Sequence, residues 1–327
     1  MTKTPDNTNT RQPPQEACFI CGNTNWQLLY KAQDFLYDLD GDFYLYECPE
    51  CGLVSTQPKL SNEEMQKYYP EDYIAYPVAV ADEKTWHQRA NRQRGVRRRC
   101  DFAIRESGMA TGKVLDVGCA TGVFLKGMRD RDWQAYGIEP SDYAANYAKE
   151  QLKLNVTHDY LKPDSYEANQ FDLITLWDVF EHLPNPEETL QIIHKILKPG
   201  GVLLLTLPNS QSWDRHIFKQ AWAGWDTPRH YFTYNEKCLT QLLERHGFSF
   251  KKLKSFTNRH GSMVYSVNFW LKSKNAPEKR RKSIEKFLNS YFFRALSYPY
   301  FIFADAINRS AGMTVTYVKK QDNPEFR

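Results

Sequence analysis

The sequence predicts an α/β fold in which a doubly wound, mostly parallel sheet carries helices on both faces. Between residues 113 and 207, short apolar runs alternate with segments of helical periodicity. A glycine-rich turn follows the first run, and a Pro-Gly-Gly sequence separates the last helical segment from the last run. Strands and helices that alternate at such lengths form parallel sheets with both faces buried.

The expected elements have recognisable ends. Ser141 is a plausible N-cap for the helix after the second strand, and Pro186 occupies the first turn of a later helix, before two acidic residues. We expect strands at residues 113–117, 135–139, 171–176 and 202–207, and a final strand at 313–320.

Length and composition indicate more than one domain. The chain has 327 residues, of which 41% are hydrophobic, and a net charge of only +4, so it is not a polycation built for nucleic acid as a whole. No secretory signal and no run of roughly 18 apolar residues is visible, so we expect a cytoplasmic protein. We divide the chain into a disordered lead (1–17), a cysteine-framed module (18–58), a helical connector (59–107), the sheet domain (108–270 with 311–320) and a basic, aromatic helical insert (271–310).

The glycine-rich turn has the position and the charge of a cofactor site. Asp116, Gly118 and Gly122 follow the first strand, and Glu139 ends the second strand roughly twenty residues later, where an acid can bind a ribose. The spacing is not the G-x-G-x-x-G of dinucleotide sites, and a carboxylate inside the turn repels a pyrophosphate. An amino group and a sulfonium cation suit these acids, which favours S-adenosylmethionine over NAD.

Three motifs, at 114–122, 171–183 and 197–206, resemble those of class I methyltransferases and cover about half of the chain. The resemblance implies a seven-stranded methyltransferase sheet. The cysteine-framed module, as a zinc ribbon, would precede this sheet, and a helical insert would precede the last strand. Position by position, it implies that the turn holds the methionine part, that one acid binds the ribose, and that two further residues line the adenine and sulfonium sites. The implied cofactor residues are Asp116, Gly118, Cys119, Gly122, Glu139, Asp159 and Trp177.

Two Cys-x-x-Cys-Gly knuckles frame the N-terminal module. Four thiolates at this spacing suit a closed tetrahedral Zn²⁺ site, and a site without an open position is structural. Disulfides are the alternative, disfavoured in the cytoplasm. The expected ligands are Cys18, Cys21, Cys48 and Cys51.

Two histidines are candidates for a catalytic base. His182 follows the strand that ends at 176, although its Glu-His pair is found in methyltransferases of many substrates and has a structural alternative. His230 lies in an aromatic, charged loop, together with the candidate substrate residues Trp225, Arg229 and Tyr231. The Pro-Arg-His-Tyr-Phe run there is similar to a bacterial subfamily tied to cell-surface glycan synthesis; the alternative is a loop held by its own aromatics and ion pairs.

The basic segments remain open to two interpretations. Arginines at 89–99 could contact phosphates or form a solvated helix face. Residues 272–307, basic and then aromatic, could contact the inner face of a membrane peripherally, or could cap the sheet or form a dimer contact; the oligomeric state is open.

The sequence therefore predicts a methyltransferase whose acceptor is a nucleotide-linked or lipid-linked saccharide. The N-terminal half of the chain resembles zinc-ribbon sugar C-methyltransferases, but O-methylation of a glycan hydroxyl is at least an equal alternative. An RNA or protein methyltransferase and a non-catalytic zinc-ribbon adaptor are the rivals.

Overall fold

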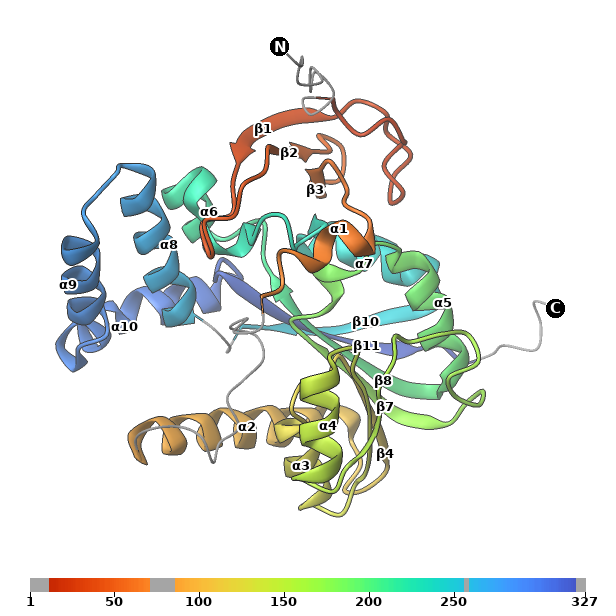
Figure 1. The fold of residues 1–327 in the computed structure, drawn as a ribbon. Helices are drawn as coiled ribbons and strands as arrows, with labels where there is room; N and C mark the ends of the chain where they lie inside the picture. Colours follow the sequence, from red (N-terminus) through yellow and green to blue (C-terminus); the bar gives the residue numbers. More distant parts are fainter. Residues whose placement is uncertain (1–11, 71–85, 256–258, 322–327) are drawn as a thin grey trace, which may run out of the picture.

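A computed structural model describes residues 12–70, 86–255 and 259–321. The expected sheet domain is present and has seven strands in the order β10-β11-β8-β7-β4-β5-β6 (Figure 1). Strands β4 to β8 pair in parallel, whereas β11 is antiparallel to both of its neighbours. The strands are β4 (Lys113–Val117), β5 (Gln134–Ile138), β6 (Asn155–Thr157), β7 (Phe171–Trp177), β8 (Leu197–Pro208), β10 (Phe248–Lys254) and β11 (Gly312–Lys319).

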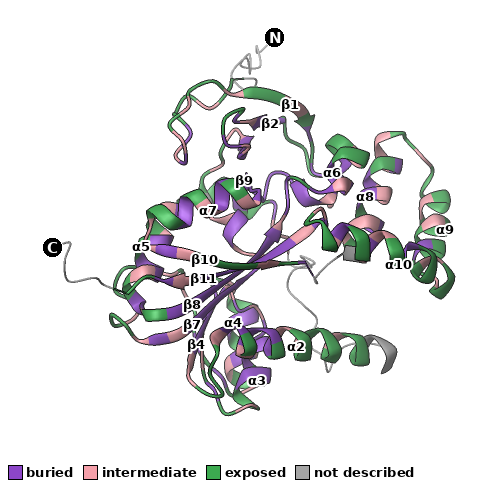
Figure 2. Ribbon diagram, turned by 180° about the vertical axis from the view of Figure 1, so that it is seen from behind, coloured by how far each residue is buried: buried purple, intermediate pink, exposed green. Residues whose placement is uncertain are grey.

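Helices cover both faces of this sheet, as the alternating sequence pattern predicts (Figure 2). The central strands are buried on both sides, so Leu115, Ile174 and Leu205 are all inaccessible to solvent. Helices α2 (Trp86–Ser107), α3 (Val123–Arg129) and α4 (Asp142–Glu150) lie on one face, and α5 (Pro186–Ile196) and α7 (Glu236–Arg245) lie on the other.

The cysteine-framed module is joined to the sheet domain by a shared sheet. Its strands β1 (Gln27–Ala32), β2 (Phe43–Glu47) and β3 (Val54–Gln57) are antiparallel. A fourth strand, β9 (Phe232–Thr233), comes from the loop between β8 and α7 and pairs with β3, so that Ser55 lies opposite Phe232. The module therefore holds the loop that carries His230.

The remaining α-helices lie outside the two layers that cover the seven-stranded sheet. Helix α1 (Asn62–Gln66) follows the module, α6 (Trp213–Phe218) follows β8, and three helices precede the last strand: α8 (Arg259–Ser273), α9 (Glu278–Leu288) and α10 (Tyr291–Ala306). Helix α8 begins in the part of the chain that we assigned to the sheet domain (108–270), and α9 and α10 lie in the expected helical insert (271–310). Aromatic side chains such as Tyr291 and Phe292 on α10 are exposed. Among the described residues, no helix combines the length and apolar character of a membrane span.

One buried ion cluster links the module to the loop after β8. The guanidinium of Arg229 is fully buried and lies 2.8 Å from Asp34 in the module and 2.6 Å from Asp226 in its own loop. It also donates to the backbone carbonyl of Tyr68 at 3.1 Å. A buried cation of this kind is stable only while its acidic partners are in place.

Replacing Asp34 with asparagine should therefore destabilise the fold strongly. The amide keeps the size of the side chain but leaves Arg229 undercompensated, and we expect a loss of about 3 kcal/mol in unfolding free energy. Urea unfolding followed by tryptophan fluorescence measures it. The control is Asp42→Asn, which breaks the exposed pair with Lys31 and should cost less than about 1 kcal/mol. Equal losses of unfolding free energy in the two variants would contradict the stabilising role of the buried ion cluster.

Candidate cofactor and acceptor site

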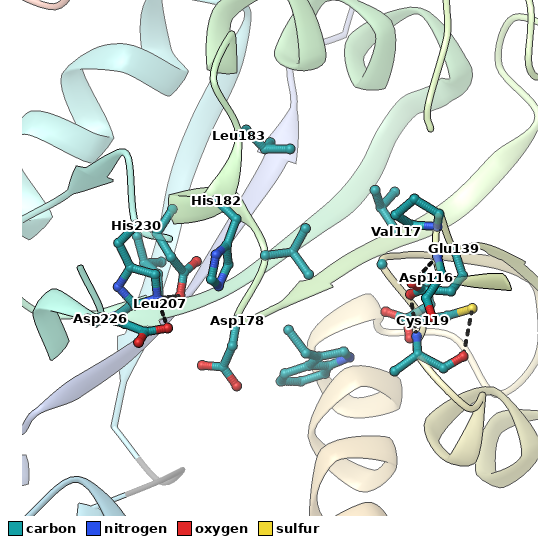
Figure 3. A pocket seen from close by; sticks show the side chains of 18 of the residues that line it. Asp116, Val117, Cys119, Glu139, Asp178, His182, Leu183, Leu207, Asp226 and His230 are labelled. Carbon is teal, nitrogen blue, oxygen red and sulfur yellow. Dashed lines mark hydrogen bonds and ion pairs between the residues drawn. The ribbon is translucent and has the colours of Figure 1, made fainter. Parts of the chain in front are cut away.

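A cleft of 1640 Å³ opens at the carboxyl ends of β4, β5 and β7, where parallel sheets bind ligands. Its walls include the turn after β4, the end of β7, the loop between β8 and α7, and faces of α2 and α8. Figure 3 shows Asp116, Cys119 and Glu139 at one end of the cleft and His182 and His230 at the other. The structure thus brings the residues expected from distant motifs to one cavity.

The turn after β4 requires its glycines. Gly118 and Gly122 have φ angles of 68° and 76°, which side chains rarely adopt. The N–H of Gly118 donates to the carbonyl of Ile138 at 2.8 Å, which fixes the turn against β5. A Cβ on Gly118 would lie 2.7 Å from a methyl of Val179, so a larger residue would displace the cleft wall.

Two buried carboxyl groups flank this turn. Asp116 accepts a hydrogen bond of 2.6 Å from the Thr175 hydroxyl, and burial raises its pKa to about 8. Glu139 accepts bonds from the backbone N–H groups of Ala120 and Ser141, at 2.8 and 2.9 Å, and burial raises its pKa as well. Burial disfavours the charged forms of both groups, and a cation bound nearby would favour those charged forms.

The other expected cofactor residues line the same cleft in different ways. Trp177 ends β7 and is buried, and its indole N–H has no hydrogen-bond partner among the residues that the structure describes. The Arg99 guanidinium lies 5.1 Å from its ring centre. Cys119 is buried, which raises the pKa of its thiol and keeps it protonated. Asp159 lies at the rim, and its ion pair of 2.6 Å with Lys162 holds its pKa below the usual value.

His182 and His230 lie together at the far end of the cleft, with ring centres 4.5 Å apart. The Nδ1 of His182 lies 3.0 Å from the carbonyl oxygen of Arg229, and the Nδ1 of His230 lies 2.9 Å from that of Gly224. Because a carbonyl can only accept, each Nδ1 carries the proton and each Nε2 keeps its lone pair. Tyr69 places its hydroxyl 3.1 Å from the same Nδ1 of His182.

Burial keeps both histidines neutral at physiological pH. It is the main cause that lowers the pKa of His182 to about 3, with a smaller contribution from His230, and it also lowers the pKa of His230. A neutral imidazole with a free Nε2 can accept a proton from an acceptor hydroxyl. A pKa of about 3 makes His182 a weak proton acceptor, so its low basicity is a cost that His182 would carry as the base.

Acidic groups around the histidines were not singled out from the sequence. Glu181 is fully buried, and one of its oxygens has no hydrogen-bond partner in residues 12–70, 86–255 and 259–321. Burial raises its pKa well above the usual value. Its Oε1 and the Oδ2 of Asp226 each lie 3.9 Å from the Nε2 of His230. The Glu-His pair of the motif was a signal for Glu181, but Asp226 could be found only through its contact with Arg229.

The three candidate substrate residues do not share one position. Tyr231 lines the cleft, and its hydroxyl donates to the carbonyl of Leu60 at 3.0 Å. Trp225 is buried behind the cleft, against Trp222 at 4.8 Å between ring centres. Arg229 is enclosed by its acidic partners, so the structure does not place it where a substrate anion could reach it.

The four cysteines of the two knuckles converge in the N-terminal module. The Sγ atoms of Cys18 and Cys51 are 3.6 Å apart and those of Cys21 and Cys48 are 3.5 Å apart. All four ligand atoms lie within 4.8 Å of one another, and all seven cysteines of the chain are free thiols. Thiolates bound to one tetrahedral ion at about 2.3 Å are separated by about 3.8 Å, so the cluster fits Zn²⁺.

The model of the methyltransferase-domain family matches residues 86–253, just over half of the chain. The chain belongs to this methyltransferase family. The carboxyl groups and the unpartnered indole of the cleft fit S-adenosylmethionine, the donor that the family implies.

Similarity to curated relatives is confined to part of this methyltransferase. A ubiquinone biosynthesis O-methyltransferase of Azoarcus sp. is 34% identical over 117 residues, and one of Pseudomonas aeruginosa is 30% identical over the same length. These matches span 34% of this chain and 50% of each relative, so the chain spans about half the length of the relatives it matches.

Solved structures resemble this chain at low sequence identity. The cyclopropane synthase MmaA2 of Mycobacterium tuberculosis is 16% identical, with a TM-score of 0.45 over 68% of this chain and 83% of that one. A phosphoethanolamine N-methyltransferase of Haemonchus contortus, in complex with S-adenosylhomocysteine, is 17% identical, with a TM-score of 0.45 over 69% and 53%.

Replacing Asp116 with asparagine should make the stability of this methyltransferase less sensitive to pH. The folded protein holds a proton on Asp116 up to about pH 8, whereas the unfolded chain releases it near pH 4. Folding therefore loses stability as pH rises between these values, and Asp116→Asn removes that loss. The unfolding free energy of the variant, relative to that of the wild type, should rise by more than about 1 kcal/mol from pH 5 to pH 8.5, because one pKa unit corresponds to about 1.4 kcal/mol.

Urea unfolding at the two pH values measures this difference. Asp159→Asn is the control, since the pKa of that exposed carboxyl lies below the tested range and its effect should not vary with pH. If the difference in unfolding free energy between Asp116→Asn and the wild type is the same at both pH values, the Asp116 carboxyl of the folded wild type is ionised over that whole range.

Proposed function

We propose that this protein transfers a methyl group from S-adenosylmethionine to a hydroxyl of a saccharide carried on a nucleotide or a lipid. The observation that carries the proposal is the pair of free Nε2 atoms of His182 and His230 in the same cleft as the buried carboxyl groups. A hydroxyl acceptor needs a base near its oxygen, whereas the donor end needs negative charge. The cleft offers both, at opposite ends.

The residues of the chain have separable roles in this proposal. The bound donor supplies an electrophilic methyl group on a sulfonium leaving group. Asp116 and Glu139 hold the cationic and ribose parts of that donor, and Trp177 borders its reactive end. One histidine accepts the proton of the acceptor hydroxyl at Nε2, while its Nδ1–H bond to a backbone carbonyl keeps the ring in orientation.

The lining of the cleft supports a polar acceptor. At the histidine end it carries the carboxyl groups of Asp178 and Asp226 beside the arginines of α2, which suit hydroxyl-rich ligands better than apolar ones. A phenolic hydroxyl is the second candidate acceptor, because the curated relatives are named as O-methyltransferases of ubiquinone biosynthesis. A screen of nucleotide sugars and catechols with radiolabelled donor separates the two.

Replacing either histidine by glutamine tests the base. If one histidine accepts the proton, its variant should lower kcat at least a hundredfold, because general-base catalysis contributes about 10² to 10⁴ in rate. Binding of S-adenosylhomocysteine, measured by calorimetry, should be unchanged. His216→Gln is the control, since that side chain is exposed and outside the cleft. Full activity in both His182→Gln and His230→Gln would exclude imidazole as the base.

We also propose that the cysteine cluster holds one structural Zn²⁺. The convergence of the four Sγ atoms supports this, and the module would transmit its order to the β8–α7 loop through the β3–β9 pair. The metal has no part in the methyl transfer in this proposal.

Metal analysis tests the zinc proposal directly. Purified protein should contain about one zinc per chain, and Cys48→Ser should lose it and lower the melting temperature, because structural zinc contributes folding energy. Cys238→Ser, which alters a buried cysteine outside the cluster, is the control and should retain the metal. Zinc-free wild-type protein with an unchanged melting temperature would contradict the proposal.

A further inference from the structure

A second cavity, of 520 Å³, lies beside the main cleft, between α2 and the helices α8 and α10. The two cavities share lining residues, among them Asn91, Arg98 and Gly261, so they adjoin each other. Neither the proposed donor site nor the proposed base uses the second cavity. A ligand in the main cleft could extend into it without crossing a wall of the protein.

The charge of this cavity is one-sided. Arg94 and Arg98 lie one helical turn apart on α2 and face the same way, and Arg294 comes from α10. None of the described residues that line the cavity is acidic. An anion bound in this cavity would form charge-assisted hydrogen bonds with guanidinium groups from both helices.

Neighbouring groups orient the basic side chains that line the second cavity. The guanidinium of Arg294 donates to the backbone and side-chain oxygens of Asn289, each at 3.3 Å, which fixes its direction. His260 lines the cavity, and within the described part of the chain its two buried ring nitrogens have no hydrogen-bond partner. A buried unpartnered imidazole costs free energy unless a ligand satisfies it.

Aromatic side chains complete the second cavity. Tyr298 and Phe301 of α10 line it, and the ring centre of Phe301 lies 6.2 Å from that of His260. The aromatic groups would pack against whatever continues from the anion, either a nucleoside or a hydrocarbon chain.

The two cavities therefore differ in charge. The main cleft has buried carboxyl groups suited to a cationic donor, and the second cavity has guanidinium groups suited to an anion. We propose that the second cavity binds the diphosphate of the acceptor, with Arg94, Arg98 and Arg294 as its ligands and His260 as a further donor. This inference rests on the proposed function, and it identifies the acceptor as a diphosphate ester, nucleoside-linked or prenyl-linked.

Calorimetric titration with inorganic pyrophosphate tests the subsite without requiring the acceptor. The wild-type protein, saturated with S-adenosylhomocysteine, should bind one pyrophosphate, and Arg94→Gln/Arg294→Gln should weaken that binding at least tenfold. Arg97→Gln is the matched control, because Arg97 lies on the same helix, lines neither cavity and pairs with Asp101 at the surface. The control should bind like the wild type.

Two further arms distinguish the source of the diphosphate. Uridine diphosphate and vesicles that contain a polyprenyl diphosphate are titrated against the same three proteins, and the source that binds more tightly than pyrophosphate identifies the class of acceptor. The double variant should lose affinity in the arm that binds.

The outcomes separate the subsite from the proposed function. If the wild type binds none of the three probes, or if the double variant binds them as the wild type does, the subsite is overturned. Methyl transfer to a saccharide would then be tested separately, by the acceptor screen described above. A double variant that also loses S-adenosylhomocysteine affinity would indicate misfolding, and the single variants Arg94→Gln and Arg294→Gln, each expected to bind severalfold more weakly, then decide the question.

Discussion

The buried ion cluster of Arg229 determines how the two halves of this protein fit together. The side chain joins Asp34 of the cysteine module to Asp226 of the β8–α7 loop, and its own carbonyl oxygen accepts the Nδ1 proton of His182. The next residue along the chain is His230. A single residue thus sets the position of one candidate base and the orientation of the other. Buried ion pairs add little net stability, but they penalise any arrangement that separates them, which suits a site assembled from distant segments.

Charge is distributed along the cavities in a way that matches methyl transfer between unlike partners. Buried carboxyl groups lie where the β4 and β5 strands end, neutral imidazoles lie beside Glu181 and Asp226 at the other end of the cleft, and further guanidinium groups of α2 and α10 line the adjoining cavity. In the function that we propose, this arrangement would direct the reactive ends of a cationic donor and an anionic acceptor toward the histidines.

Local patterns in the sequence were sufficient for part of this structure. The parallel sheet, the turn with Gly118 and Gly122, and the paired cysteines are all encoded within short windows of chain. The two-residue strand β9 could not be predicted, because Phe232 and Thr233 become a strand only by pairing with β3 in another part of the chain. Arg229 was assigned to substrate for the same reason: nothing near it in sequence indicates Asp34. The subsite around Arg94 and Arg294 likewise depends on two helices that are far apart along the chain, although the arginine run itself was visible.

The pairing of β3 with β9 bears on how this architecture can be modified or exchanged. A module held by its own metal and linked by a flexible tether could be transplanted between proteins as a unit. Here, a graft of residues 18–58 alone would present an unpaired strand edge and the uncompensated carboxylate of Asp34. The module and the histidine-bearing loop would have to be exchanged together, and substitutions in one are expected to be tolerated only with matching substitutions in the other.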